Sequence, residues 1–152
     1  MVAVALLTQT WLWMGVMGAP IGYTFEQSGA GYSYRQFLVG GAPGDLAPAG
    51  NMTIRADPHH FEQDWDLAGG GAVHISEEFP PYAILLGGQP SDAELIAAVH
   101  MRSNWQETTA LGGRVNALRA TIGRTRVSIE GPLSYDELFR IALTLRPGFA
   151  PL

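Results

Sequence analysis

Residues 57–66 hold the densest group of side chains that could do chemistry. The sequence there is DPHHFEQDWD, and imidazole and carboxylate groups are common protein ligands of divalent metal ions. The candidate metal ligands are His59, His60, Asp64 and Asp66. The two histidines are adjacent, so they lack the spacing of a helical ligand pair, and in a strand they would point to opposite faces. We therefore expect an exposed acidic loop without a metal or other cofactor, and keep a metal-dependent enzyme as the alternative.

Ser91 and Ser134 each precede a predicted helix and could be mistaken for nucleophiles. Each is followed three residues later by a glutamate, Glu94 or Glu137, which is the spacing of a capping box. In this motif the serine hydroxyl accepts a hydrogen bond from the third backbone N–H of the helix, and the glutamate accepts one from the serine N–H. We predict that both serines are helix caps.

Other reactive groups are sparse. Glu77 and Glu78 could supply a proton donor and a base, but no partner is apparent for them, and we predict the solvated end of a strand. The chain has no Cys, which excludes disulfides and thiolate chemistry. The sequence therefore indicates a protein that is not an enzyme.

The net charge of −5 conceals an asymmetry along the chain. Residues 1–100 carry two Arg and ten acidic residues, whereas residues 101–152 carry seven Arg and four acidic residues. An acidic chain is atypical of nucleic-acid binders, so that class is disfavoured. The basic residues gather in a predicted hairpin, where they form either a solvated face or a surface for an acidic partner or lipid headgroups. These partner-facing candidates are Arg114, Arg119, Arg124 and Arg126.

The elements that position these residues are mostly strands. Alternating or β-rich patterns predict strands at 32–39, 51–56 and 72–76, and a hairpin of two strands turns at 122–124. Helices are predicted from Ser91 to Arg102 and from Ser134 to Leu145. Leu138, Ile141, Ala142 and Leu145 give the second helix one buried face. Strands joined by short turns, with two helices, favour an α+β fold.

The first 20 residues form a separate apolar segment, because no charged residue occurs from Met1 to Phe25. The segment is long enough to cross a bilayer as one helix. It has no positive end typical of a signal peptide, and Pro20 ends it. A membrane helix and a segment buried in a protein core or interface both fit. The candidate membrane or interface residues are Leu6, Leu7, Trp11, Leu12 and Trp13.

The C-terminal third resembles an extracytoplasmic domain of unknown function that follows the membrane helix in bacterial anti-sigma factors. The matching residues are TTALGGRVNALR at 108–119, RVSIEG at 126–131 and LSYDELFRIALTL at 133–145. That family is similar to lipoprotein carriers and sigma-regulator sensors, whose curved antiparallel sheet is covered by helices. The resemblance implies a non-catalytic domain outside the cytoplasm. It does not imply anti-sigma activity, because the cysteine-containing zinc-binding part of those proteins has no counterpart here.

Together these features predict a single α+β domain at 21–152, preceded by an apolar helix at 1–20. We expect a curved antiparallel sheet with two capped helices packed on one face. The expected function is that of a non-catalytic sensor, scaffold or accessory subunit, attached to a membrane or membrane complex on the periplasmic or exterior side. A carrier for an apolar ligand is the alternative among binding proteins, and nucleic acid is not an expected partner.

Overall fold

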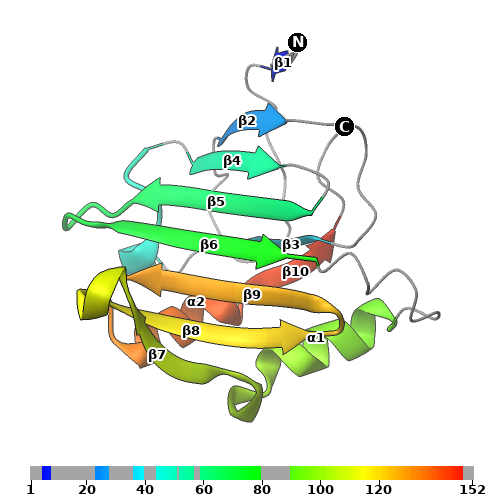
Figure 1. Ribbon diagram of the computed structural model, residues 1–152. Coiled ribbons are helices and arrows are strands. Elements are labelled where there is room, and N and C mark those ends of the chain that lie inside the picture. Colours follow the sequence, from blue (N-terminus) through cyan, green and yellow to red (C-terminus); the bar gives the residue numbers. More distant parts are fainter. Residues whose placement is uncertain are drawn as a thin grey trace.

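The computed structural model describes residues 5–7, 23–27, 36–39, 44–50, 52–56, 59–79 and 90–148. These residues form a mostly antiparallel β-sheet with two α-helices. The predicted α+β class is therefore confirmed. Figure 1 shows both helices on the same side of the sheet, together with the short strands β3 and β10.

The main sheet has eight strands in the order β1-β2-β4-β5-β6-β9-β8-β7. Neighbouring strands are antiparallel except β2 and β4, which run parallel. The strands are β1 (Ala5–Leu7), β2 (Tyr23–Gln27), β4 (Met52–Ala56), β5 (His60–Asp66), β6 (Ala72–Glu78), β7 (Gln106–Ala110), β8 (Val115–Ile122) and β9 (Thr125–Gly131). β3 (Gln36–Val39) and β10 (Leu145–Gly148) pair separately. The pairing of β6 with β9 joins the earlier strands to the C-terminal ones.

Both α-helices begin with the capping box that the sequence predicts. They are α1 (Asp92–His100) and α2 (Tyr135–Ala142). The Ser91 hydroxyl accepts from the Glu94 N–H at 3.3 Å, and the Glu94 carboxylate accepts from the Ser91 N–H at 2.7 Å. The corresponding distances at Ser134 and Glu137 are 3.3 and 2.8 Å. Short 3-10 helices lie in the connections: η1 (Gly44–Leu46), η3 (Arg102–Asn104) and η4 (Leu111–Gly113).

The hydrophobic core lies between the helices and the sheet. α2 packs on β8 and β9 and buries Leu138, Ile141 and Ala142 completely. Leu145 is also buried, as predicted, but it belongs to β10 and not to the helix. The helix ends at Ala142, and in the turn after it the N–H and the hydroxyl of Thr144 both donate to the Ile141 carbonyl.

Residues 60–66 form strand β5, so the prediction of a loop at 57–66 is wrong for this part of the segment. Phe61, Gln63 and Trp65 are buried, and the strand is paired on both sides, with β4 and with β6. An antiparallel strand with one solvated face alternates buried and polar residues. Here histidine and acidic residues occupy the solvated positions, and Gln63 occupies a buried one, which makes the strand look like a polar loop in the sequence.

The structure describes only Ala5–Leu7 of the apolar segment at 1–20. These residues form β1, in which Leu6 is in register with Glu26 and Leu7 with Phe25. The remainder of the predicted helix, with Trp11, Leu12 and Trp13, lies outside the described residues. Within the described part of the chain, no helix is long and apolar enough to cross a membrane.

Candidate functional site

The face of the main sheet that is turned away from the helices is polar, and we call it the open face. Side chains alternate between the two faces of each strand, so burial of one set against the helices leaves the other set on the open face. In the described part of the chain both helices lie on the opposite side (Figure 1). The charged and hydroxyl residues on the central strands of this face are Thr53, Arg55, His60, Glu62, Asp64, Asp66, His74, Ser76, Glu78, Arg119, Thr121, Arg126, Ser128 and Glu130.

Strand pairing arranges these side chains in rows that run across the strands. The central row, from β5 to β8, is Glu62, Ser76, Ser128 and Arg119. One flanking row is Asp64, His74 and Glu130, and the other is His60, Glu78, Arg126 and Thr121. Directly opposite residues have Cβ atoms about 4.5–5.5 Å apart. Each row is therefore a line of side chains close enough to interact with their neighbours.

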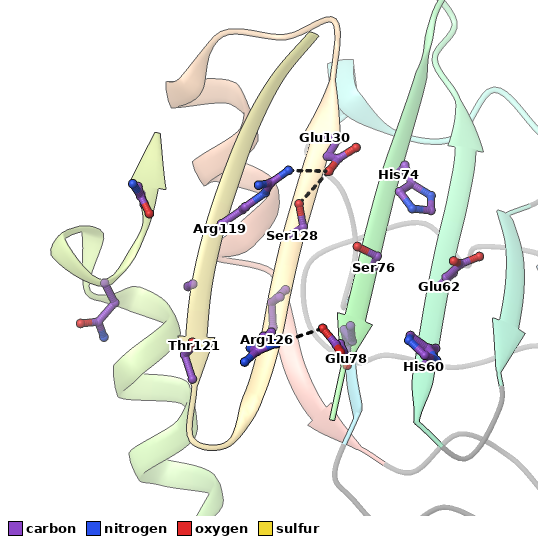
Figure 2. Close-up of a pocket in the computed structure, with 15 residues that line it drawn as sticks. His60, Glu62, His74, Ser76, Glu78, Arg119, Thr121, Arg126, Ser128 and Glu130 are labelled. Atoms are coloured by element: carbon purple, nitrogen blue, oxygen red, sulfur yellow. Dashed lines mark hydrogen bonds and ion pairs between the residues drawn. The ribbon is translucent and has the colours of Figure 1, made fainter. Parts of the chain in front are cut away.

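A hollow of about 670 Å³ lies over these rows. Its lining includes residues from β5, β6, β8 and β9, together with Asn104 and Gln106. Figure 2 shows Ser76 and Ser128 between Glu62 on one side and Arg119 on the other. The hollow is therefore lined by charged groups of both signs, with hydroxyl groups between them.

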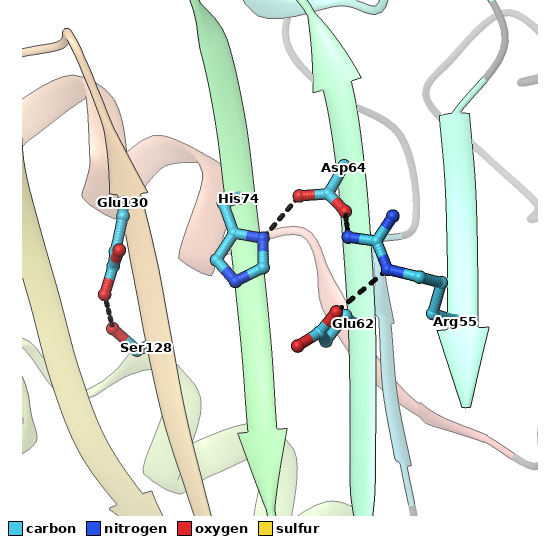
Figure 3. Close-up of polar contacts among 6 residues, drawn as sticks. All are labelled: Arg55, Glu62, Asp64, His74, Ser128 and Glu130. Carbon is cyan, nitrogen blue, oxygen red and sulfur yellow. Dashed lines mark hydrogen bonds and ion pairs between the residues drawn. The ribbon is translucent and has the colours of Figure 1, made fainter. Parts of the chain in front are cut away.

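Asp64 is at the centre of a chain of polar contacts across β4, β5 and β6 (Figure 3). One of its carboxylate oxygens accepts from the Arg55 guanidinium, and the other is hydrogen-bonded to Nδ1 of His74. Arg55 also donates from Nε to Glu62 at 3.0 Å. The carboxylate of Asp64 is thus held by two partners, Arg55 and His74, on two different strands.

These contacts shift the pKa values of both members of the pair. The hydrogen bond to Asp64 raises the pKa of His74 above its ordinary value; burial opposes this shift, and the charges of Asp64, Glu62 and Glu130 reinforce it. Burial acts to raise the pKa of Asp64, but the contacts with His74 and Arg55 outweigh it and lower that pKa. The imidazolium–carboxylate form of the pair is therefore favoured.

Arg119 and Arg126 are the basic residues of the hollow, and both are well exposed. The exposed fractions of their side chains are 54% and 55%. Arg119 lies 3.7 Å from Glu130, a carboxylate that also accepts from the Ser128 hydroxyl at 2.9 Å. Arg126 donates to Glu78 at 3.4 Å.

The predicted metal ligands do not come together as a metal site. His60, Asp64 and Asp66 share the open face because they alternate along β5, whereas His59 precedes that strand. Asp64 already accepts from Arg55 and His74. Among the described residues, no group of three His, Asp or Glu side chains is arranged to hold a metal ion.

The structure divides the predicted arginine cluster. Arg119 and Arg126 lie together in the hollow, whereas Arg114 precedes β8 and Arg124 lies in the turn at its other end. A strand rises about 3.3 Å per residue, so the ends of β8 are too far apart for all four to form one surface. Arg119 and Arg126 therefore share one part of the open face, while Arg114 and Arg124 lie at the two ends of β8.

The acidic pair at 77–78 is also divided. Glu78 is solvated and interacts with Arg126, but Glu77 is buried on the helix side of β6, with 1% of its surface exposed. Successive residues of a strand point to opposite faces, so the prediction that both were solvated is wrong for Glu77.

Sequence reasoning missed His74, Ser76 and Ser128 as members of the site. Alternation in β9 already indicated that Arg126, Ser128 and Glu130 share one face. What the sequence could not reveal is that β6 lies between β5 and β9, because that pairing joins distant segments.

Comparison of the chain with family models, with curated proteins and with solved structures finds no match.

Proposed function

We propose that the chain is a non-catalytic binding domain and that the open face is its docking surface. The observation that carries this proposal is the continuous set of charged and hydroxyl side chains around the hollow, on the face of the sheet opposite the described helices. Sheets of this kind need only one covered face for a core. The other face is then available for a partner.

The contacts on the open face support binding over catalysis. Asp64 is held by Arg55 and His74, and these contacts lower its pKa. A general base must be able to take a proton, and a carboxylate with a lowered pKa takes one less readily. The polar lining also favours a polar partner over the apolar ligand of a carrier, since pockets for apolar ligands are lined mainly by apolar side chains.

The proposed role is that of a sensor, scaffold or accessory subunit of a membrane complex, on the outer side of the membrane. The uncharged sequence from Met1 to Phe25 supports a membrane attachment, and the resemblance to the extracytoplasmic domain supports the location. The domain would then present the open face to a neighbouring subunit or to a signalling partner.

A photo-crosslinking experiment tests the docking surface. A photoreactive amino acid is placed at Thr121, an exposed residue of the hollow, or at Ala97, an exposed residue of α1 on the helix side. In cells that produce the full chain, we expect a discrete crosslinked product from position 121 and none from position 97. Equal products from both positions, or none from either, would contradict the proposal.

The metal-dependent enzyme remains the competing function, and metal analysis separates it. We expect the purified chain and a variant with His59→Ala and His60→Ala to have the same metal content after exposure to zinc or manganese. Loss of a stoichiometric metal in the variant would establish the enzyme alternative as the better one.

A further inference from the structure

The charge asymmetry of the sequence becomes a division of the open face into two halves. β5 and β6 carry the acidic residues Glu62, Asp64, Asp66 and Glu78, together with His60 and His74. Arg55 of β4 pairs with Glu62 and Asp64. β8 and β9 carry Arg119 and Arg126, and β9 also carries Glu130. The hollow spans the boundary between these halves, so a ligand in it meets Glu62 and Glu78 on one side and Arg119 and Arg126 on the other.

The central row sets the distance between the two charges. Glu62 and Arg119 are its ends, and Ser76 and Ser128 lie between them in register. The row crosses three gaps between neighbouring strands, and each gap is about 4.8 Å wide, so its ends are roughly 14 Å apart. An extended peptide covers this distance in about four residues at ~3.3 Å per residue.

The middle of the row suits a peptide backbone. A serine hydroxyl can both donate and accept a hydrogen bond. The Ser128 hydroxyl donates to Glu130, so it can accept from an N–H of a chain that lies above it, whereas Ser76 can bind an N–H or a carbonyl group. The acidic half disfavours a polyanion such as nucleic acid or an anionic lipid surface, because like charges repel. A volume of about 670 Å³ lies within the range of about 300–1,000 Å³ of small-ligand sites.

We propose that the hollow binds an extended segment of a partner protein, laid across the strands, with a basic side chain over Glu62 and an acidic side chain over Arg119. This inference rests on the proposed binding function and names the chemistry of the partner. Arg55 already donates to Glu62, and Glu130 lies near Arg119. The segment therefore adds a second counter-ion to each end of the row.

Synthetic peptides test the charge pattern directly. The probe is acetyl-Arg-Ser-Gly-Ser-Glu-amide, added to the full chain at low ionic strength and followed through backbone amide chemical shifts by NMR, which detects millimolar binding. Matched peptides carry Arg at both ends, Glu at both ends, or Gln at both ends. We expect shifts confined to β5, β6, β8 and β9 with the mixed-charge peptide, weakened by 0.3 M salt, and at least twofold weaker binding of the other three.

Charge-neutralising variants locate the contacts. We expect Glu62→Gln and Arg119→Gln each to weaken the mixed-charge peptide about two- to fivefold, the effect of losing one exposed ion pair. Asp136→Asn and Arg114→Gln are the matched controls, because Asp136 is 94% exposed on α2 and Arg114 lies outside the hollow.

Equal binding of all four peptides, or equal effects of controls and test variants, would overturn the inference. Crosslinks at position 121 without this charge dependence would leave the proposed function standing and remove only the partner chemistry.

Discussion

At the scale of the residue, the Asp64–His74 pair links two neighbouring strands of the open face. It joins β5 to β6 on the solvated side of the sheet, and Arg55 extends the contact to β4. Because a shifted pKa means that one protonation state is preferred by the folded protein, this pair makes stability depend on pH.

We expect His74→Gln to reduce the pH dependence of unfolding. The pKa of His74 is raised above 6.5, so its contribution is fully present below pH 6.5 and is lost as pH rises through the folded-state pKa. The pKa of Asp64 is lowered from 3.8, so its contribution is present above that value and is lost in more acidic solution. The variant should be about 0.5–1 kcal/mol less stable near pH 5.5 and nearly equal to the parent at high pH.

Urea unfolding at several pH values measures this difference, and NMR titration of the histidine rings provides a direct control. Asp64→Asn should lower the pKa of His74. Parallel stability profiles for the parent and His74→Gln would show that the pair does not act as proposed.

Gly123 is the second residue whose local geometry has a measurable effect. It has φ +61° in the β8–β9 turn, and a Cβ atom there would lie 2.8 Å from Cδ2 of Leu95, a buried residue of α1. We expect Gly123→Ala to cost more than about 1–2 kcal/mol, the cost of a left-handed conformation alone. Gly112→Ala, at φ +66° with no atom within 4 Å, should show that cost without the clash. Chemical denaturation of both variants tests the order, and equal losses would contradict it.

At the scale of the element, local signals in the sequence predicted both helix starts and the hairpin of β8 and β9. The two capping boxes and the hairpin turn were readable because their interactions join residues close together in the chain. Strand β5 was not predicted, because its polar residues fit a strand only once the two neighbouring strands that pair with it are known. The end of α2 was also misplaced, since buried Leu145 continues the helical pattern although it lies in a strand.

The caps should contribute measurably to stability. We expect Ser134→Ala to lower the free energy of unfolding by about 1 kcal/mol, because the hydrogen bond to the Glu137 N–H is lost. Ser134→Asp should retain most of the stability, since aspartate also caps helices. Ser103→Ala, at an exposed position in η3, is the matched control. Thermal and urea unfolding would refute the assignment if Ser134→Ala and Ser103→Ala behaved alike.

At the scale of the whole molecule, the sequence predicted the fold class but not the order of strands. The α+β class follows from many short strands with two helices. The candidate site depends on β6 lying beside β9, and segments this far apart leave no local signature. Sequence reasoning therefore found Arg119 and Arg126 but could not place them opposite Glu62 and Glu78.

The proposed attachment of the chain to a membrane can be tested by fractionation. We expect the intact chain to sediment with membranes and to be digested by protease added outside intact spheroplasts. Deletion of residues 2–20 should shift it to the soluble fraction. Recovery of the intact chain in the cytosol would contradict a membrane-attached role, while the docking surface would still be testable by crosslinking.

The pairing of β6 with β9 has a further consequence for any ligand of the hollow. Among the described strands of the main sheet, the β6–β9 pair joins the segment that ends at Glu78 to the segment that begins at Gln106. Ser76 and Ser128 are directly opposite each other in this pair. A molecule bound over both serines would contact both stretches of chain in the folded state only. Its binding would therefore raise the melting temperature by mass action. A thermal-shift measurement would therefore detect ligands of the hollow without an activity assay.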